Sequence, residues 1–68
     1  MKKKVLKALS DAGFNLDLWY DHKAMQWIFI GPDTMDWYST STYIYRLSDI
    51  SLAQWVEMAE YMQKQNIG

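Results

Sequence analysis

The sequence has a single histidine, His22, and it directly follows Asp21. A carboxylate beside an imidazole could orient a general base or contribute to a metal site. Catalysis also needs a nucleophile or a second acid–base group, and zinc needs three or four nitrogen, sulfur or oxygen ligands. The chain has no cysteine and no second histidine, and no residue spacing supplies such partners. We therefore predict a non-enzymatic protein with no catalytic residue, metal ligand or cofactor, and we place His22 in a turn.

The remaining polar residues do not form a recognisable chemical motif. The acidic residues are dispersed, and the three glycines stand apart from one another, so there is no glycine-rich phosphate loop. The run of residues 39–42, Ser-Thr-Ser-Thr, could bind a ligand or attract a kinase, but threonine is also common in strands. We interpret this run as part of a strand.

Basic residues gather at the start of the chain, where Lys2, Lys3, Lys4 and Lys7 make up four of the seven lysines and arginines. Such a patch could neutralise phosphates, with exposed aromatic rings as stacking platforms for bases. The formal charge of −1 argues against a general affinity for nucleic acid. Nucleic acid is therefore not the expected partner, and these four lysines are the candidate contacts in that alternative.

The two ends of the chain have the residue patterns of helices. In residues 2–12 the apolar side chains recur at helical spacing. Gly13 suits the left-handed residue after a helix, with Phe14 next to it in position to contact Leu9. We therefore predict a helix that ends in a Schellman motif.

The C-terminal helix is predicted to begin after Ser51. Ser51 and Gln54 have the spacing of a capping box, and Ile50 and Trp55 that of a hydrophobic staple. The side chains expected to form the buried stripe are Leu52, Trp55, Val56, Ala59 and Met62.

Between the helices, apolar and polar residues alternate and predict a hairpin of residues 14–20 and 24–30. Pairing Asp21 with Ala24 would place Tyr20 opposite Met25 and Leu18 opposite Trp27. The face covered by the helices would then carry Phe14, Leu16, Leu18, Met25, Trp27 and Phe29. On this basis we expect Trp27, like Trp55, to belong to the core.

The sequence Gly-Pro-Asp-Thr at positions 31–34 predicts a turn. Residues 35–47 are rich in aromatic and β-branched side chains and are expected to be extended, as one long strand or as two short strands broken near 39–42. The predicted fold class is α+β: residues 1–68 form a single small domain, α-β-β-β-α, whose three-stranded antiparallel sheet is covered on one face by two helices.

Two helices can cover only one face of such a sheet, so the other face is predicted to be exposed. It would carry Trp19, Gln26, Ile28 and Ile30, joined by Tyr38 and Ile44 from the third strand. Exposed apolar area marks contact surfaces, and tryptophan and tyrosine are favoured in binding hot spots. The residues predicted to bind a protein partner are Trp19, Gln26, Ile28, Ile30 and Tyr38. In the alternative, the strands curl or residues 39–47 fold over this face and bury it.

Three segments, MKKKVLKALSDAGF, WIFIGPD and LSDISLAQWVEMAEYM, give the chain its overall character. In this it resembles the small orphan proteins of bacterial phages and prophages. The resemblance implies an inhibitor of a host defence protein, such as an anti-CRISPR protein. A homodimer that buries the exposed face against its own copy is a further alternative.

The order α-β-β-β-α is also similar to that of double-stranded RNA-binding domains. Those domains carry a basic motif at the start of the second helix. Here residues 51–55 read Ser-Leu-Ala-Gln-Trp, with Glu57 and Glu60 following, so the phosphate clamp is missing. The likeness therefore extends to the order of elements alone.

No segment approaches the ~18 apolar residues of a membrane span. The apolar stretch after the first lysines is interrupted by Lys7, Ser10 and Asp11, which does not fit a secretory signal peptide. We therefore expect a cytoplasmic protein with no membrane partner.

Overall fold

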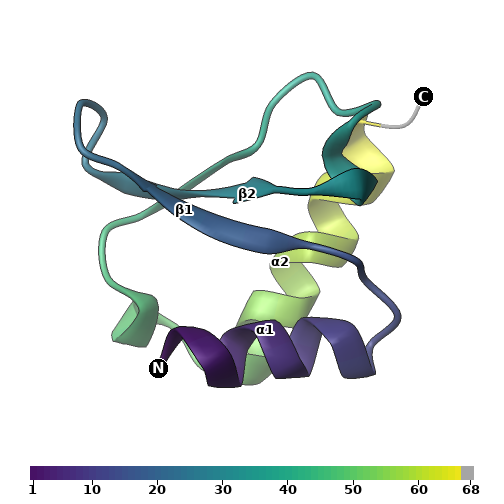
Figure 1. Cartoon of the computed structure of the whole chain (residues 1–68), viewed down its shortest axis with the longest axis horizontal. Helices are drawn as coiled ribbons and strands as arrows, with labels where there is room; N and C mark the ends of the chain where they lie inside the picture. The colour runs from purple at the N-terminus through teal and green to yellow at the C-terminus, as the bar shows by residue number, and fades with distance from the viewer. Residues whose placement is uncertain (67–68) are drawn as a thin grey trace.

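The structure is a computed structural model that describes residues 1–66. Its helices and strands are α1 (Lys2–Asp11), β1 (Asp17–Asp21), β2 (Gln26–Ile30), β3 (Ser41–Ile44) and α2 (Leu52–Asn66). Two short 3₁₀ helices, η1 (Pro32–Thr34) and η2 (Leu47–Asp49), flank β3 in the sequence. The strands form an antiparallel sheet in the order β1-β2-β3 (Figure 1). The predicted fold class, a small α+β domain of order α-β-β-β-α, is confirmed.

Helix α1 ends as its sequence predicts. The backbone N–H of Phe14 donates to the carbonyl of Leu9, and that of Gly13 donates to Ser10, both at 2.9 Å. Gly13 has a φ of +93°, the left-handed conformation that glycine adopts without penalty. These are the two hydrogen bonds of the Schellman motif, and both Leu9 and Phe14 belong to the core.

Helix α2 begins with the predicted capping box. The Ser51 backbone N–H donates to Oε1 of Gln54 at 2.8 Å, and the Gln54 backbone N–H donates to Oγ of Ser51 at 3.1 Å. The indole Nε1 of Trp55 also donates to the Leu47 carbonyl at 2.9 Å, which ties η2 to the helix. The start of α2 and the preceding 3₁₀ helix therefore form one hydrogen-bonded unit.

The β1–β2 hairpin has the predicted faces but a different register. Leu18 pairs with Phe29 and Tyr20 with Trp27, two residues away from the predicted pairing. The register differs because the connection between the strands is longer and spans residues 22–25. In this connection the Asp21 carboxylate accepts hydrogen bonds from the backbone N–H groups of Lys23 and Ala24. A shift of two preserves the alternation of side chains between the two faces. Met25, by contrast, was wrongly placed on the covered face, because it lies in the connection and is 57% exposed.

The third strand is much shorter than the extended segment predicted over residues 35–47. The chain turns again after η1, where the Trp37 backbone N–H donates to the Thr34 carbonyl at 3.0 Å. This turn buries the Trp37 side chain, whose ring meets that of Phe29 edge to face at 6.0 Å. Burial of Trp37 therefore replaces strand pairing in this part of the chain, and β3 begins only at Ser41.

The core lies between the two helices and one face of the sheet. Its buried members are Val5, Leu9, Phe14, Leu18, Phe29, Trp37, Trp55, Ala59 and Met62. Phe29 is at the centre, since its ring also meets that of Trp55 edge to face at 5.9 Å. We call the face of the sheet that carries Leu18, Tyr20, Trp27 and Phe29 the inner face, and the opposite face the outer face.

Candidate binding surfaces

The outer face of the sheet carries an apolar patch at its centre. Trp19 and Ile28 are cross-strand partners, and Ile30 follows on β2 with the same orientation. Trp19 is 52% exposed and Ile30 38% exposed, whereas Ile28 between them is half-buried. Among residues 1–66, both helices pack on the inner side, so neither covers this patch.

The remaining residues predicted for this face have different positions. Gln26 lies at the edge of the outer face, where its Oε1 accepts a hydrogen bond from the Tyr43 backbone N–H at 2.8 Å. The expectation that Tyr38 and Ile44 extend the patch was wrong. Tyr38 stands in the loop before β3 and is 93% exposed, and Ile44 pairs with Trp27 and packs against the core.

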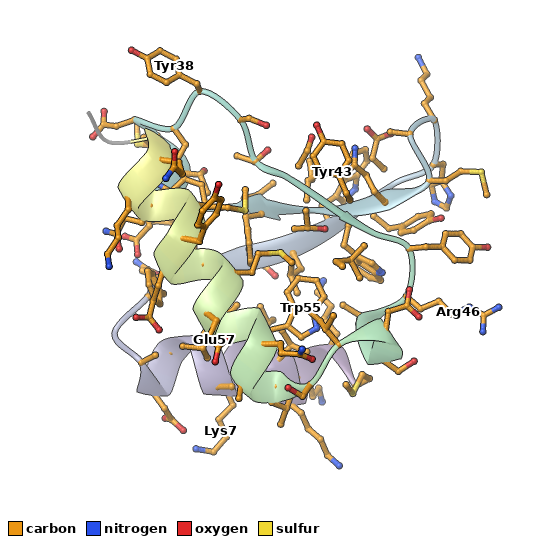
Figure 2. The ribbon with its side chains drawn as sticks, turned by 180° about the vertical axis from the view of Figure 1, so that it is seen from behind. Lys7, Tyr38, Tyr43, Arg46, Trp55 and Glu57 are labelled. Carbon is orange, nitrogen blue, oxygen red and sulfur yellow. The ribbon has the colours of Figure 1, made fainter. Side chains whose placement is uncertain are left out.

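Tyr43 is a surface residue that the sequence did not indicate. The pairing of β3 shifts between Trp27 and Ile28, and in this bulge Tyr43 has a φ of +60°. Its side chain is 83% exposed and projects on the side of the sheet away from α1 (Figure 2). The bulge thus adds an aromatic ring on the outer side at a position that a regular register would not supply.

Carboxylates border the apolar patch. Asp17 and Asp21 lie on either side of Trp19 along β1 with the same orientation. One Asp17 oxygen lies 3.8 Å from Nζ of Lys2, and the Asp21 carboxylate accepts backbone hydrogen bonds within the hairpin connection. The patch therefore has an apolar centre and an acidic border.

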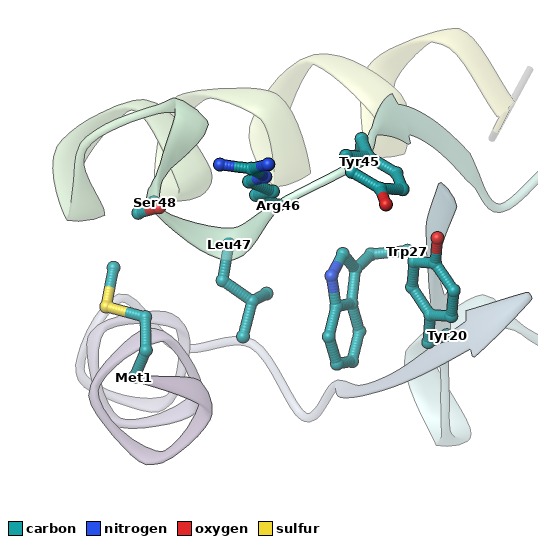
Figure 3. A pocket seen from close by; sticks show the side chains of 7 residues that line it. All are labelled: Met1, Tyr20, Trp27, Tyr45, Arg46, Leu47 and Ser48. Carbon is teal, nitrogen blue, oxygen red and sulfur yellow. The ribbon is translucent and has the colours of Figure 1, made fainter. Parts of the chain in front are cut away.

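On the inner face, the helices cover only one end of the sheet. Leu18 and Phe29 are buried beneath them, but the neighbouring pair, Tyr20 and Trp27, lies towards the hairpin connection and is only half-buried. An open groove of about 490 Å³ lies at this end of the sheet (Figure 3). We call it the aromatic groove, and its lining residues are Met1, Tyr20, Trp27, Tyr45, Arg46, Leu47 and Ser48.

Three rings of the aromatic groove meet edge to face. The Tyr20 ring lies 5.4 Å from that of Trp27 and 6.2 Å from that of Tyr45, measured between centroids. The Arg46 guanidinium lies over the Tyr45 ring, with Cζ 5.7 Å from the centroid. Desolvation, followed by the neighbouring Tyr45 and Asp21, raises the pKa of Tyr20 above its ordinary value, so its hydroxyl stays protonated at neutral pH.

Sequence reasoning missed the aromatic groove because it assigned Trp27 to the core. The available indication was Arg46, the sole arginine in the chain, which directly follows the aromatic residue Tyr45. Its position opposite Tyr20 and Trp27 depends on the bulged pairing of β3, which residue spacing does not reveal.

The residue considered for chemistry and the lysines considered for phosphate binding lie in different parts of the fold, the hairpin connection and α1. His22 lies in the hairpin connection, where its ring meets that of Tyr20 edge to face at 4.9 Å. Within residues 1–66 there is no group of three or more histidine, aspartate or glutamate side chains that could hold a metal ion. Of the four N-terminal lysines, Lys2 lies near Asp17, and Lys7 forms an ion pair with Asp11 at 3.0 Å.

No helix among the described residues is both long enough and apolar enough to cross a membrane. Comparison of the chain with protein-family models, curated proteins and solved structures finds no match.

Proposed function

We propose that this protein is a small, non-enzymatic binding module that docks on another protein through the outer face of its sheet. The observation that carries the proposal is the patch of Trp19, Ile28 and Ile30, which neither helix covers. Partly exposed tryptophan on such a platform presents a large contact area with little side-chain entropy to lose. Tyr43 adds a second aromatic ring on the same side.

The acidic border indicates the chemistry of the partner. A surface with an apolar centre and lysine or arginine around it would complement Asp17 and Asp21. The same carboxylates oppose the approach of a phosphate backbone to this face. The resemblance to phage and prophage proteins suggests that the partner is a bacterial defence protein, which would make this chain an inhibitor acting in the cytoplasm.

The test is a pull-down with the tagged protein from a bacterial lysate, with and without nuclease treatment, followed by mass spectrometry. We expect one protein to be retained in stoichiometric yield by the unsubstituted chain and lost with Trp19→Ala and with Ile28→Asp. Tyr61→Ala is the matched control, because Tyr61 is also an exposed aromatic residue, 64% exposed, but lies on α2. Urea denaturation of each variant verifies that its fold is intact.

The outcomes distinguish the alternatives. Retention of the partner by both outer-face variants would contradict docking through this face. Recovery that disappears with nuclease, and with Lys3→Glu and Lys4→Glu, would instead support nucleic-acid binding. The molecular mass of the purified chain in solution is the further measurement. A rise to twice the monomer mass as the concentration increases, reversed by Ile28→Asp, would indicate that the partner is a second copy of the chain.

A further inference from the structure

We propose that the aromatic groove is a second binding site, which takes an aromatic side chain carried by an acidic segment of a partner protein. It is formed by the inner face, Met1 and residues 45–48, whereas the docking surface proposed above is the outer face. The two sites therefore involve different side chains. One proposal can fail without the other.

The groove is large enough for an aromatic ring, and its lining suits one. A volume of about 490 Å³ falls within the range of ~300–1,000 Å³ that is usual for ligand sites. The rings of Tyr20, Trp27 and Tyr45 already meet edge to face, which leaves ring faces and edges available to another aromatic group. In Figure 3, Met1 and Leu47 close the opposite side with apolar side chains.

The charge of the lining favours an anionic neighbour beside that ring. Among residues 1–66, no carboxylate lines the groove, and every polar side chain that does can donate a hydrogen bond: the Arg46 guanidinium, the Trp27 indole and the hydroxyls of Tyr20, Tyr45 and Ser48. Asp49 belongs to η2, but its carboxylate accepts a hydrogen bond from the Arg46 backbone N–H at 3.1 Å and does not line the groove.

Two of these donors face the same side. Figure 3 shows the indole nitrogen of Trp27 turned toward the side of the groove on which Arg46 lies. In the proposed site, this N–H and the guanidinium donate to the same carboxylate of the partner. A cationic ligand is disfavoured, because Arg46 already holds the cation–π position over the Tyr45 ring.

The openness of the groove favours a ring presented by a polypeptide over a free small molecule. Ligand sites for small molecules bury most of the ligand surface, whereas this groove is open along one side. A polypeptide can insert one side chain and place the flanking carboxylates at the rim, near Arg46.

The experiment is an NMR titration of the full chain with three probes, followed through its indole N–H resonances. The first probe is an acetylated and amidated peptide Glu-Glu-Trp-Glu-Glu. The second is the same peptide with lysine in place of glutamate, and the third is indole-3-acetate. We expect the acidic peptide to shift the Trp27 indole resonance and to bind at least tenfold more tightly than either of the other two.

Variants then assign the site. Arg46→Gln should weaken binding of the acidic peptide about tenfold, as expected for loss of one charged hydrogen bond, and Arg46→Lys should restore part of it. Tyr45→Leu should weaken binding without removing the charge. Trp19→Ala, on the outer face, should leave the affinity unchanged.

Four results would overturn the proposal. These are no binding of the acidic peptide, equal or tighter binding of the lysine peptide, shifts confined to the Trp19 indole, and indole-3-acetate binding as tightly as the peptide. The last result would identify a site for small aromatic anions instead of a protein segment.

Discussion

Two cross-strand pairs lie next to each other on the inner face of the sheet and have different environments. Leu18 and Phe29 are 1% and 0% exposed beneath the helices, whereas Tyr20 and Trp27 are half-buried beside the aromatic groove. Both pairs are formed by the same two strands and point the same way. Alternation along a strand therefore decides which face a side chain lies on, but the reach of the helices decides whether it becomes core or surface.

The covered end should be the more sensitive to truncation, and Trp55 is the sharpest probe of it. We expect Trp55→Ala to lower the free energy of unfolding by ~3–5 kcal/mol, as for other buried aromatic residues. The side chain is fully buried, packs on Phe29 and donates to the Leu47 carbonyl. Urea denaturation followed by circular dichroism measures the change, and a loss below about 1 kcal/mol would contradict this view of the core.

At the open end, Trp27→Ala should cost about half as much, ~1.5–2.5 kcal/mol, because a half-buried ring loses less buried surface on truncation. The measurement is the same denaturation experiment, made side by side with Trp55→Ala. Equal losses for the two variants would show that both ends of the inner face are core, and the comparison between them would fail.

The junction between η2 and α2 connects the two ends, and its capping box can be tested separately. Ser51→Ala removes the acceptor for the Gln54 backbone N–H and should destabilise the protein by about 1 kcal/mol. Ser10→Ala is the matched control, since Ser10 is exposed in α1 and its substitution should change stability by less than about 0.5 kcal/mol. Equal changes in stability for the two serine variants would contradict a stabilising role for the capping box.

The smallest expected effect is a pH dependence at the open end. The folded protein raises the pKa of Tyr20 above its ordinary value, so the unfolded chain ionises first as the pH rises. The contribution of the neutral hydroxyl is complete below the unfolded pKa and is lost as the pH passes through the higher, folded value. Stability should therefore fall less in Tyr20→Phe than in the unsubstituted protein between pH values of about 9 and 11. An identical fall in stability for both proteins would contradict a raised pKa of Tyr20 in the folded state.

Local residue patterns were sufficient to predict the helix ends and the faces of the hairpin. Gly13 with Phe14, and Ser51 with Gln54, act through hydrogen bonds within a few residues, so their positions in the sequence indicate their geometry. The alternation around Trp19 and Trp27 likewise indicated opposite faces, and it survived a register shift of two because side chains repeat with a period of two.

Longer-range features did not follow from these patterns. The bulge in β3 depends on pairing with β2, and the burial of Trp37 depends on packing against Phe29. The length of the hairpin connection is set locally, by hydrogen bonds to the Asp21 carboxylate that the alternation of apolar residues does not reveal. The pattern of residues predicted a strand at Tyr38, where the structure has a loop. It also predicted the outer face for Ile44, which packs against the core instead. The sequence pattern did not single out Arg46. Tyr20 and Trp27, which line the groove with it, lie on β1 and β2, far from Arg46 in the sequence.

The sequence by itself thus determined which elements form, where the helices begin and end, and which side of β1 and β2 each residue occupies. These properties arise from hydrogen bonds and periodicities within a few residues. Only the tertiary structure decided which half of the inner face became core and which half stayed open as the aromatic groove. That outcome depends on where two helices come to rest on the sheet, and their packing is a property of the whole chain.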